Sequence, residues 1–119
     1  MLNEQFAVQF AHEWVYAWNS HDIDAIMSHY ADNIHFQSPI IIRVNNDPSG
    51  TITDKQTLKA YFSKALGIYT DLHFELYKVL VSINSVVLYY KTINDMYTAE
   101  YMEIDEHGKV VKVCAHYSN

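Results

Sequence analysis

The chain has 119 residues, 50% of them hydrophobic and 14% aromatic, which is enough apolar material for one packed domain but too short a chain for two. Its formal net charge is -6 at pH 7 and its few Lys and Arg residues form no cluster, so we expect no nucleic-acid partner. No apolar stretch approaches the roughly 20 residues that span a bilayer, so we expect no membrane partner either. The single Cys114 cannot form an intramolecular disulfide, and MLNEQFAVQF lacks the basic region of a secretory signal. We therefore expect residues 1–119 to form one cytoplasmic domain.

Two helices are predicted at the start of the chain. Residues 3–19 can begin at Asn3 as N-cap and repeat large side chains at helical spacing, namely Phe6, Phe10, Trp14 and Trp18. Asp22 can cap a second, shorter helix that runs to Tyr30, where the segment NIHFQS becomes extended and stops at Ser38-Pro39. The spacing predicts a helical hairpin with an aromatic stripe, which can be plain core or can also line a pocket.

The middle of the chain contains a loop and a third helix. Residues 43–52 hold Asn-Asn-Asp and Pro-Ser-Gly, and this turn chemistry predicts a loop or lid. In the following segment Thr53 and Gln56 fit a capping box, apolar residues recur helically, and Gly67 can end the helix.

The last part of the chain has the pattern of strands. We expect strands over residues 72–82, 86–93, 96–105 and 109–118, because short polar turns separate them. Consecutive strands imply an antiparallel meander, and helices followed by a sheet predict an α+β fold in which a curved sheet wraps the helices.

Familiar catalytic motifs are missing. HEWVY starts like the H-E-x-x-H zinc motif but has Tyr16 at the second ligand position, and the seven histidines show no ligand spacing, so we expect no metal site. There is no G-x-S-x-G elbow, and Cys114 lies among strand residues, so covalent catalysis is not indicated. We expect no cofactor.

Two runs of sequence carry a resemblance to a known family. WVYAWNSHDIDAIMSHYADNIHFQSP and YMEIDEHGKVVKVCAHY resemble the nuclear transport factor 2-like (NTF2-like) superfamily, in its SnoaL-like branch. The similarity extends over nearly the whole chain, and its main features are Trp18-Asn19, Asp22-x-Asp24, Tyr30-Ala31-Asp32, Pro39, Ile104-Asp105 and Gly108-Lys109-Val110.

The resemblance implies a fold and a range of functions. It implies a cone-shaped, strongly curved mixed or antiparallel sheet wrapped around the N-terminal helices, an apolar pocket, and a homodimer formed through the outer sheet face. This fold hosts isomerases, cyclases, dehydratases and non-enzymatic modules, so the residues of the site must decide between them.

Ketosteroid isomerase is similar over the same stretch and offers three roles to compare. The position of its catalytic base, just before the proline, matches Ser38, which cannot act as a base near neutral pH without a partner. Its oxyanion tyrosine matches Trp14, and its protonated acid matches Glu100. Of the three matched positions, only Glu100 has a side chain of the same chemical type as in the isomerase. The acid/base aspartate of the polyketide cyclases matches Ala115, so both familiar mechanisms lose their base.

Glu100 is the predicted catalytic residue. Alternation places Thr98, Glu100, Met102 and Ile104 on one strand face, and Val111, Val113, Ala115 and Tyr117 form the apolar face of the next strand. If these faces line the pocket, desolvation raises the pKa of Glu100 and allows it to act as an acid/base or hydrogen-bond donor. If they face outward, Glu100 is merely solvated.

The sequence thus leads to a hypothesis and an alternative. We expect a dimeric protein that binds a small, mostly apolar molecule, with walls formed by Trp14, Trp18, Tyr30, Ser38, Met102 and Tyr117. Any catalysis would be cofactor-free proton transfer on a hydrophobic carbonyl compound, as in isomerisation, cyclisation or dehydration. Tyr30 can equally be a core tyrosine, and His116 is expected on the outer face or at a dimer interface. The alternative is a non-catalytic module that uses the fold for dimerisation or protein contact.

Overall fold

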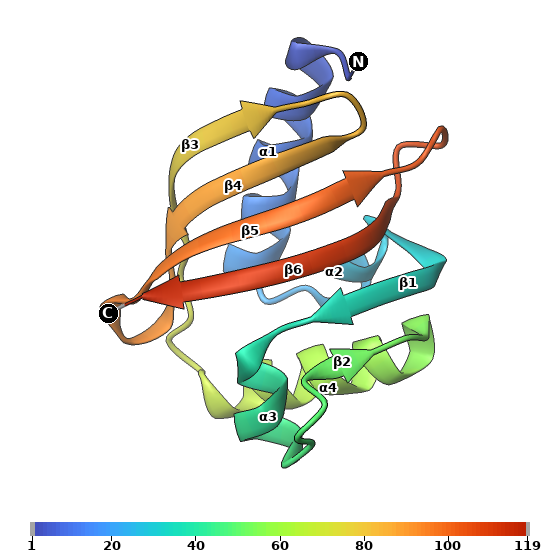
Figure 1. Ribbon diagram of the computed structural model, residues 1–119. Coiled ribbons are helices and arrows are strands. Elements are labelled where there is room, and N and C mark those ends of the chain that lie inside the picture. Colours follow the sequence, from blue (N-terminus) through green and yellow to red (C-terminus); the bar gives the residue numbers. More distant parts are fainter. Residues whose placement is uncertain (1, 119) are drawn as a thin grey trace.

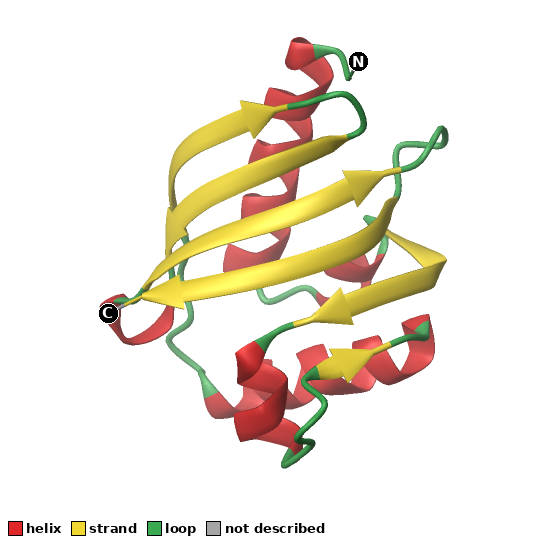
Figure 2. Ribbon diagram, viewed as in Figure 1, coloured by secondary structure: helices red, strands yellow, loops and turns green. Residues whose placement is uncertain are grey.

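The computed structural model describes residues 2–118 and has the expected mixed α+β architecture (Figure 1). One six-stranded sheet forms a layer, α1 lies behind it, and α3 and α4 lie at one end (Figure 2). The elements in chain order are α1 (Glu4–Asn19), α2 (Ile23–Met27), β1 (Tyr30–Gln37), α3 (Pro39–Asn45), β2 (Thr51–Ile52), α4 (Lys55–Ile68), β3 (Glu75–Val81), β4 (Ser85–Lys91), the 3-10 helix η1 (Ile93–Asp95), β5 (Tyr97–Ile104) and β6 (Val110–Ser118).

The two N-terminal helices begin at the predicted caps. The Asn3 side chain accepts a hydrogen bond from the backbone N–H of Phe6, and Asp22 does the same for Ala25, which satisfies N–H groups that have no partner within the helix. The second helix ends at Met27, three residues earlier than expected. Tyr30 instead begins β1, because it pairs with Val110 of β6.

The segment after β1 differs from the expected loop. Ser38 ends the strand and caps a new helix, α3, by accepting a hydrogen bond from the Ile40 N–H at 3.2 Å. Pro39 occupies the first helical turn, where its fixed φ is favourable and its missing N–H is not needed. The helix ends at Asn45, and its C-cap residue Asn46 has a left-handed φ of 51°. The predicted loop over 43–52 is therefore helical at its start and enters β2 at its end.

The third predicted helix is present, but its ends differ from the prediction. Asp54 caps α4 by accepting a hydrogen bond from Thr57 N–H at 2.8 Å, so the expected capping box of Thr53 and Gln56 is wrong. Both Thr and Asp are good N-caps, and sequence alone did not separate them. Gly67 does not end the helix, because it lies within α4 and does not adopt a left-handed φ.

The sheet has the strand order β2-β1-β6-β5-β4-β3. The last four strands form the predicted antiparallel meander, β1 lies parallel to β6, and β2 pairs antiparallel with β1. The sheet is not closed, since β2 and β3 are its two edges. Its inner face packs on the helices, and the core lies between these layers.

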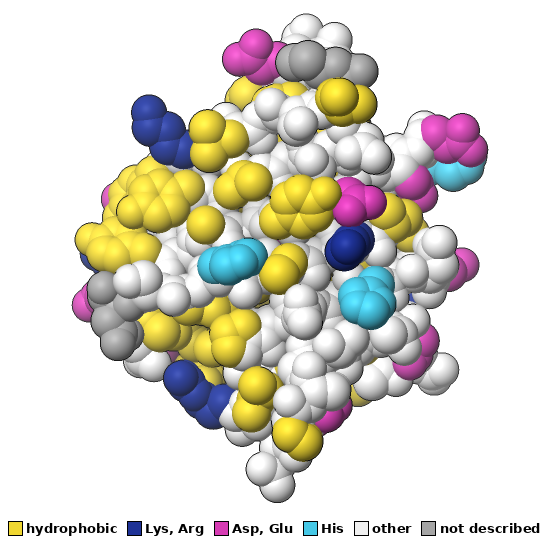
Figure 3. Space-filling model, in the orientation of Figure 1, with side chains coloured by type: hydrophobic (Ala, Val, Ile, Leu, Met, Phe, Trp, Pro, Cys, Tyr) yellow, Lys and Arg dark blue, Asp and Glu magenta, His cyan; other side chains and the backbone are white. Residues whose placement is uncertain are grey.

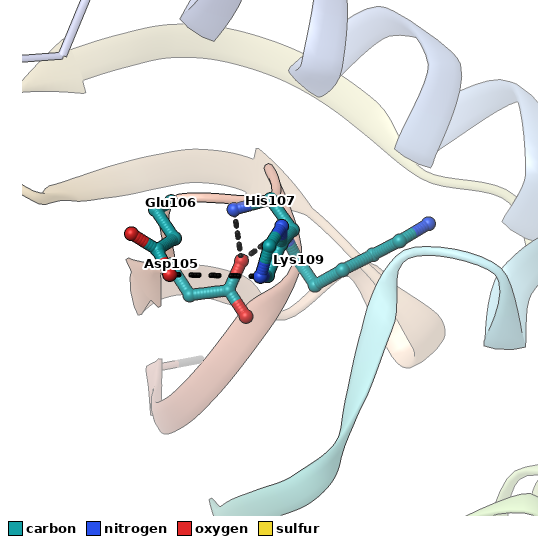
Figure 4. A network of polar contacts seen from close by, with 4 residues as sticks. All are labelled: Asp105, Glu106, His107 and Lys109. Atoms are coloured by element: carbon teal, nitrogen blue, oxygen red, sulfur yellow. Dashed lines mark hydrogen bonds and ion pairs between the residues drawn. The ribbon is translucent and has the colours of Figure 1, made fainter.

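The turn between β5 and β6 is held by one side chain (Figure 4). Asp105 Oδ1 accepts hydrogen bonds from the backbone N–H groups of His107 and Lys109, both at 2.9 Å. Gly108 has a φ of +76°, a conformation that L side chains rarely adopt. This turn fixes the register of the strands that carry Glu100 and Tyr117.

A bulge follows the turn and changes which residue at the start of β6 lies on the inner face of the sheet. Ile104 pairs with Val110, whereas Glu103 pairs with Lys112, so one strand has an extra residue. Val110 is fully buried and Val111 only partly, which places Val110 on the inner face in place of the predicted Val111. Within residues 2–118, no helix combines the length and the apolar character needed to cross a bilayer.

Candidate active site

A cavity of about 50 Å³ lies between the inner face of the sheet and the helices, at the end where α3 and α4 pack. Aromatic rings from α1, β1, α4, the segment before β3, and β4 form most of its wall, namely Trp14, Trp18, Phe36, Phe62, Phe74 and Tyr90. Tyr69, Leu72, Ile93 and Tyr117 also line it. This combination of apolar rings with few polar groups is typical of small-molecule sites.

Glu100 is the acidic residue of the cavity wall. It lies on β5 between Leu88 of β4 and Ala115 of β6, and only 3% of its surface is exposed. The Tyr90 hydroxyl donates a hydrogen bond to Glu100 Oε1 at 2.5 Å. The side chain therefore points inward. Of the two orientations that the sequence left open, toward the pocket or toward solvent, the structure has the first.

The environment of Glu100 changes its acidity. Burial raises its pKa from the ordinary value of 4.5 to about 7, because a carboxylate loses hydration in an apolar wall, while the Tyr90 hydrogen bond acts in the opposite direction. The described lining residues include no Lys, Arg or His to stabilise the charge. Near pH 7 the carboxyl can thus both accept and release a proton, which is what general acid–base catalysis requires.

Trp14 and Tyr30 form a buried pair beside the cavity. The Trp14 Nε1–H donates to the Tyr30 hydroxyl at 3.0 Å, and each residue is 1% exposed. Burial and the nearby Glu100 raise the pKa of Tyr30 far above its ordinary range, so the phenol stays neutral. Trp14 lines the cavity, whereas Tyr30 is not a lining residue and holds Trp14 through this hydrogen bond.

Trp18 also lines the cavity, and its side chain lies close enough to the Tyr30 hydroxyl to lower the pKa of that phenol. Its ring packs against Phe62 and Phe74, with centroid distances of 4.7 and 5.4 Å. Among the described residues, neither the buried Trp18 Nε1 atom nor the Thr98 hydroxyl makes a well-aligned hydrogen bond within 3.5 Å. Most buried polar groups are hydrogen-bonded, so these two are exceptions that need an explanation.

Ser38, which the sequence resemblance matched to the position of a catalytic base, is surrounded by structural contacts. It is 1% exposed, caps α3, and its side chain interacts with the phenols of Tyr61 and Tyr117. These interactions lower the pKa of both phenols, but burial is the larger effect and raises each well above its ordinary value. Ser38 does not line the cavity, and neither does Met102, which is fully buried on β5.

The structure thus brings four of the seven predicted site residues to one cavity, namely Glu100, Trp14, Trp18 and Tyr117. Sequence reasoning missed Tyr90, the direct partner of Glu100. The signal was available in part, because Tyr90 follows the buried Leu88 by two residues, and Leu88 pairs with Glu100 in the sheet. Diagonal neighbours on one sheet face come within reach of long side chains.

Two residues of the first helical hairpin hold the segment before β3 at the cavity. Asn19 Nδ2 donates to the Phe74 carbonyl at 3.0 Å, and the Phe74 N–H donates to Asn19 Oδ1 at 2.6 Å. The His21 ring nitrogen Nε2 lies 2.8 Å from the Leu72 carbonyl. Because Leu72 and Phe74 line the cavity, these contacts help to set its shape. Across residues 2–118, no group of three or more His, Cys, Asp or Glu side chains is arranged to hold a metal ion.

Comparisons with known proteins place this fold in a family. The profile of the SnoaL-like domain matches residues 11–118. A SnoaL-like protein of unknown function from Burkholderia thailandensis is 39% identical, with 98% of each chain covered and a TM-score of 0.94. No curated protein matches.

More distant structures share the fold alone. IdmH, a candidate polyketide cyclase from Streptomyces antibioticus, is 13% identical, with 95% of this chain and 92% of that chain covered and a TM-score of 0.78. A candidate ketosteroid isomerase from Kribbella flavida is 15% identical, with coverages of 98% and 79% and a TM-score of 0.74. With a family profile over most of its length and a relative at 39% identity, the chain belongs to the SnoaL-like domain family of the NTF2-like fold.

Proposed function

We propose that the protein binds a small hydrophobic carbonyl compound in the aromatic cavity and transfers a proton on it without a cofactor. The observation that supports this most is Glu100, a carboxyl in an apolar wall whose pKa is raised to about 7. A group with a pKa near the working pH is an efficient general acid and base. The named activities of the distant structural neighbours, isomerisation and cyclisation, belong to the same kind of chemistry.

The proton transfer needs no reactant besides the substrate, Glu100 and solvent protons. The carboxylate takes a proton from a carbon next to the carbonyl, and the C–H bonding electrons form an enolate. The protonated Glu100 then returns a proton to the enolate. In isomerisation the proton goes to another carbon, and in simple hydrogen exchange it goes to the same carbon after the carboxyl proton has been replaced by one from the solvent. Tyr90 keeps the carboxyl oriented through its hydrogen bond to Oε1.

Deuterium exchange tests this function without knowledge of the natural substrate. Acetophenone is incubated with the protein in D2O, and proton NMR follows the loss of its methyl signal, because those protons lie next to the carbonyl. We expect protein-dependent exchange that rises with pH through about 7 as Glu100 ionises, and its loss in Glu100→Gln. Glu103→Gln is the matched control, because this Glu lies in the same strand but does not line the cavity.

Two results would count against the proposal. Exchange at the same rate in Glu100→Gln and in the wild-type protein would show that Glu100 is not the base. If acetophenone and other small ketones neither bind nor exchange, the ligand of the cavity is not a small carbonyl compound. Native mass spectrometry, followed by denaturation and identification of released molecules, gives an independent search for a ligand that copurifies with the protein.

A second candidate role, self-association, is favoured by the outer face of the sheet. Tyr77, Tyr89 and Tyr97 lie there with ring centroids 5.6 to 6.2 Å apart, each more than a third exposed, and Leu80 is 55% exposed. Figure 3, which views this face, shows hydrophobic side chains gathered over β3, β4 and β5. Exposed apolar groups of this kind mark association surfaces, so we propose a homodimer formed through this face.

Analytical ultracentrifugation tests the homodimer. Tyr89→Asp introduces a charge into the tyrosine cluster and should shift the protein toward monomer, whereas Ile83→Asp, in the exposed turn between β3 and β4, should not. A wild-type monomer at high protein concentration would contradict the proposal. If the cavity binds nothing and the dimer forms, a non-catalytic interaction module becomes the better account. The cytoplasmic location remains a prediction.

A further inference from the structure

The cavity in this structure is too small for the ligand that the proposed function requires. Its volume of about 50 Å³ is a third of the volume, on the order of 150 Å³, of a cavity that holds one benzene ring. Protein interiors are packed as densely as organic crystals, so a ring can enter only if part of the wall moves. The part that moves also determines where the ligand enters.

Most of the wall is held in place by regular structure. Glu100 and Tyr117 lie on the paired strands β5 and β6. Trp14 of α1 is tied to Tyr30 of β1 by the hydrogen bond of 3.0 Å, and Phe62 of α4 lies within a cluster of aromatic rings. Moving any of these walls would break hydrogen bonds or separate closely packed rings.

The remaining part of the wall lacks such support. It consists of residues 69–73, which lead from α4 toward β3, and residues 92–96, which contain η1 and connect β4 to β5 (Figure 1). The first segment contributes Leu72 to the cavity wall, and the second contributes Ile93. Both segments lie beyond the paired part of β3 and β4, and within residues 2–118 no hydrogen bond or ion pair joins one segment to the other. Side-chain packing alone holds the wall together between them.

A second hollow, with a volume of about 330 Å³, lies on the outside of this wall. Thr92 and Ile93 line both the hollow and the cavity. Leu72 lines the cavity, whereas its neighbours Asp71 and His73 line the hollow. The hollow and the cavity are therefore separated by a single layer of side chains.

We infer that Leu72 and Ile93 form a gate, and that a ligand passes through the outer hollow into the cavity when the two segments that carry these side chains move apart. The inference rests on the proposed function, because the ligand that the gate admits is the one on which Glu100 acts, and it adds the route of entry. Both gate side chains are apolar, and Leu72 is buried and Ile93 half-buried. They limit the access of water to Glu100, which helps to keep the pKa of that carboxyl raised.

Quenching of tryptophan fluorescence by acrylamide measures access to the cavity. Acrylamide is a small neutral amide that quenches on contact, and both tryptophans of the chain line the cavity. Ile93→Ala should raise the Stern–Volmer constant about threefold, because opening then has to separate less apolar surface. Ile93→Val removes a single carbon and should raise it by less. Ile23→Ala is the matched control and should leave it unchanged, because Ile23 is also half-buried but lies on α2 and does not line the cavity.

Binding kinetics distinguish a gate from an ordinary wall contact. Stopped-flow fluorescence follows the binding of acetophenone to the wild-type protein and to Ile93→Ala. A weakened gate lowers the barrier in both directions, so association and dissociation should accelerate by a similar factor and Kd should change little. Loss of a wall contact would accelerate dissociation alone and raise Kd.

The outcomes separate the gate from the proposed function. Equal quenching in the wild-type protein and both Ile93 variants, or an equal rise in Ile23→Ala, would overturn the gate, and so would faster dissociation without faster association. A rise in quenching confined to the Ile93 variants, with no binding of acetophenone to any of the proteins, would support the gate and contradict the proposed function.

Discussion

Replacement of Glu100 by Gln should change how the stability of the protein depends on pH. Gln has nearly the same shape and can still accept the Tyr90 hydrogen bond, but it cannot ionise. The wild-type side chain must ionise in an apolar wall as the pH rises, and the variant avoids this. As the pH rises from acidic to alkaline values, the variant should therefore become more stable relative to the wild-type protein.

The magnitude follows from the pKa of Glu100. The pKa is about 7 in the folded chain and 4.5 as the ordinary value, and each pKa unit corresponds to about 1.36 kcal/mol, so the effect is about 3 kcal/mol. Between these two values the folded chain binds more protons than the unfolded chain. The free energy of unfolding of the wild-type protein therefore falls as the pH rises through this window, and the loss is complete above pH 7.

Urea unfolding at pH 4.5, 6 and 8 measures the effect. The difference in unfolding free energy between Glu100→Gln and the wild-type protein should increase by about 3 kcal/mol in favour of the variant from pH 4.5 to pH 8. The difference, rather than either curve alone, cancels the titration of the other acids and histidines. Glu103→Gln serves as the control on the same strand. A Glu100→Gln difference that is constant over this range would refute the assignment of a raised pKa.

Three further predictions concern the surroundings of the cavity. Tyr90→Phe removes the hydrogen bond that lowers the pKa of Glu100, so the carboxyl should titrate at higher pH by ¹³C NMR, and an unchanged midpoint would argue against that contact. Asn19→Ala removes two hydrogen bonds to the Phe74 backbone and should lower the unfolding free energy by about 1–3 kcal/mol in urea, against a small effect for the exposed Asn33→Ala. Ser38→Ala removes the cap of α3 and should destabilise the protein by about 1 kcal/mol while deuterium exchange of acetophenone continues, whereas loss of exchange in a folded variant would give Ser38 a catalytic role.

The elements with strong local signals could be predicted from the sequence. The aromatic stripe and Asn3 define α1, and the turns that separate the β-branched runs define the meander. Alternation along β5 predicted that Thr98, Glu100 and Met102 share one face, and all three are buried. The direction of that face, toward the cavity rather than outward, followed only from the packing of the sheet on the helices.

The remaining differences come from local competition and from register. Ser38-Pro39 suits a turn and the start of a helix equally well, and the buried face of α3 selects the helix. The bulge that puts Val110 on the inner face depends on the geometry of the turn held by Asp105. Tyr90 meets Glu100 because of the pairing of β4 with β5, which no local pattern specifies. The size of the cavity depends on how side chains from many elements pack.

The role of Glu100 in proton transfer is best tested by an NMR titration of its side-chain carboxyl carbon, with and without acetophenone. We expect a midpoint near pH 7 in the free protein and a higher midpoint with acetophenone bound, because a neutral ligand displaces water from the carboxyl and disfavours its charged form further. A midpoint near the ordinary value of 4.5, or one that saturating acetophenone leaves unchanged, would contradict the claim that Glu100 is the proton-transferring group of a ligand-binding cavity.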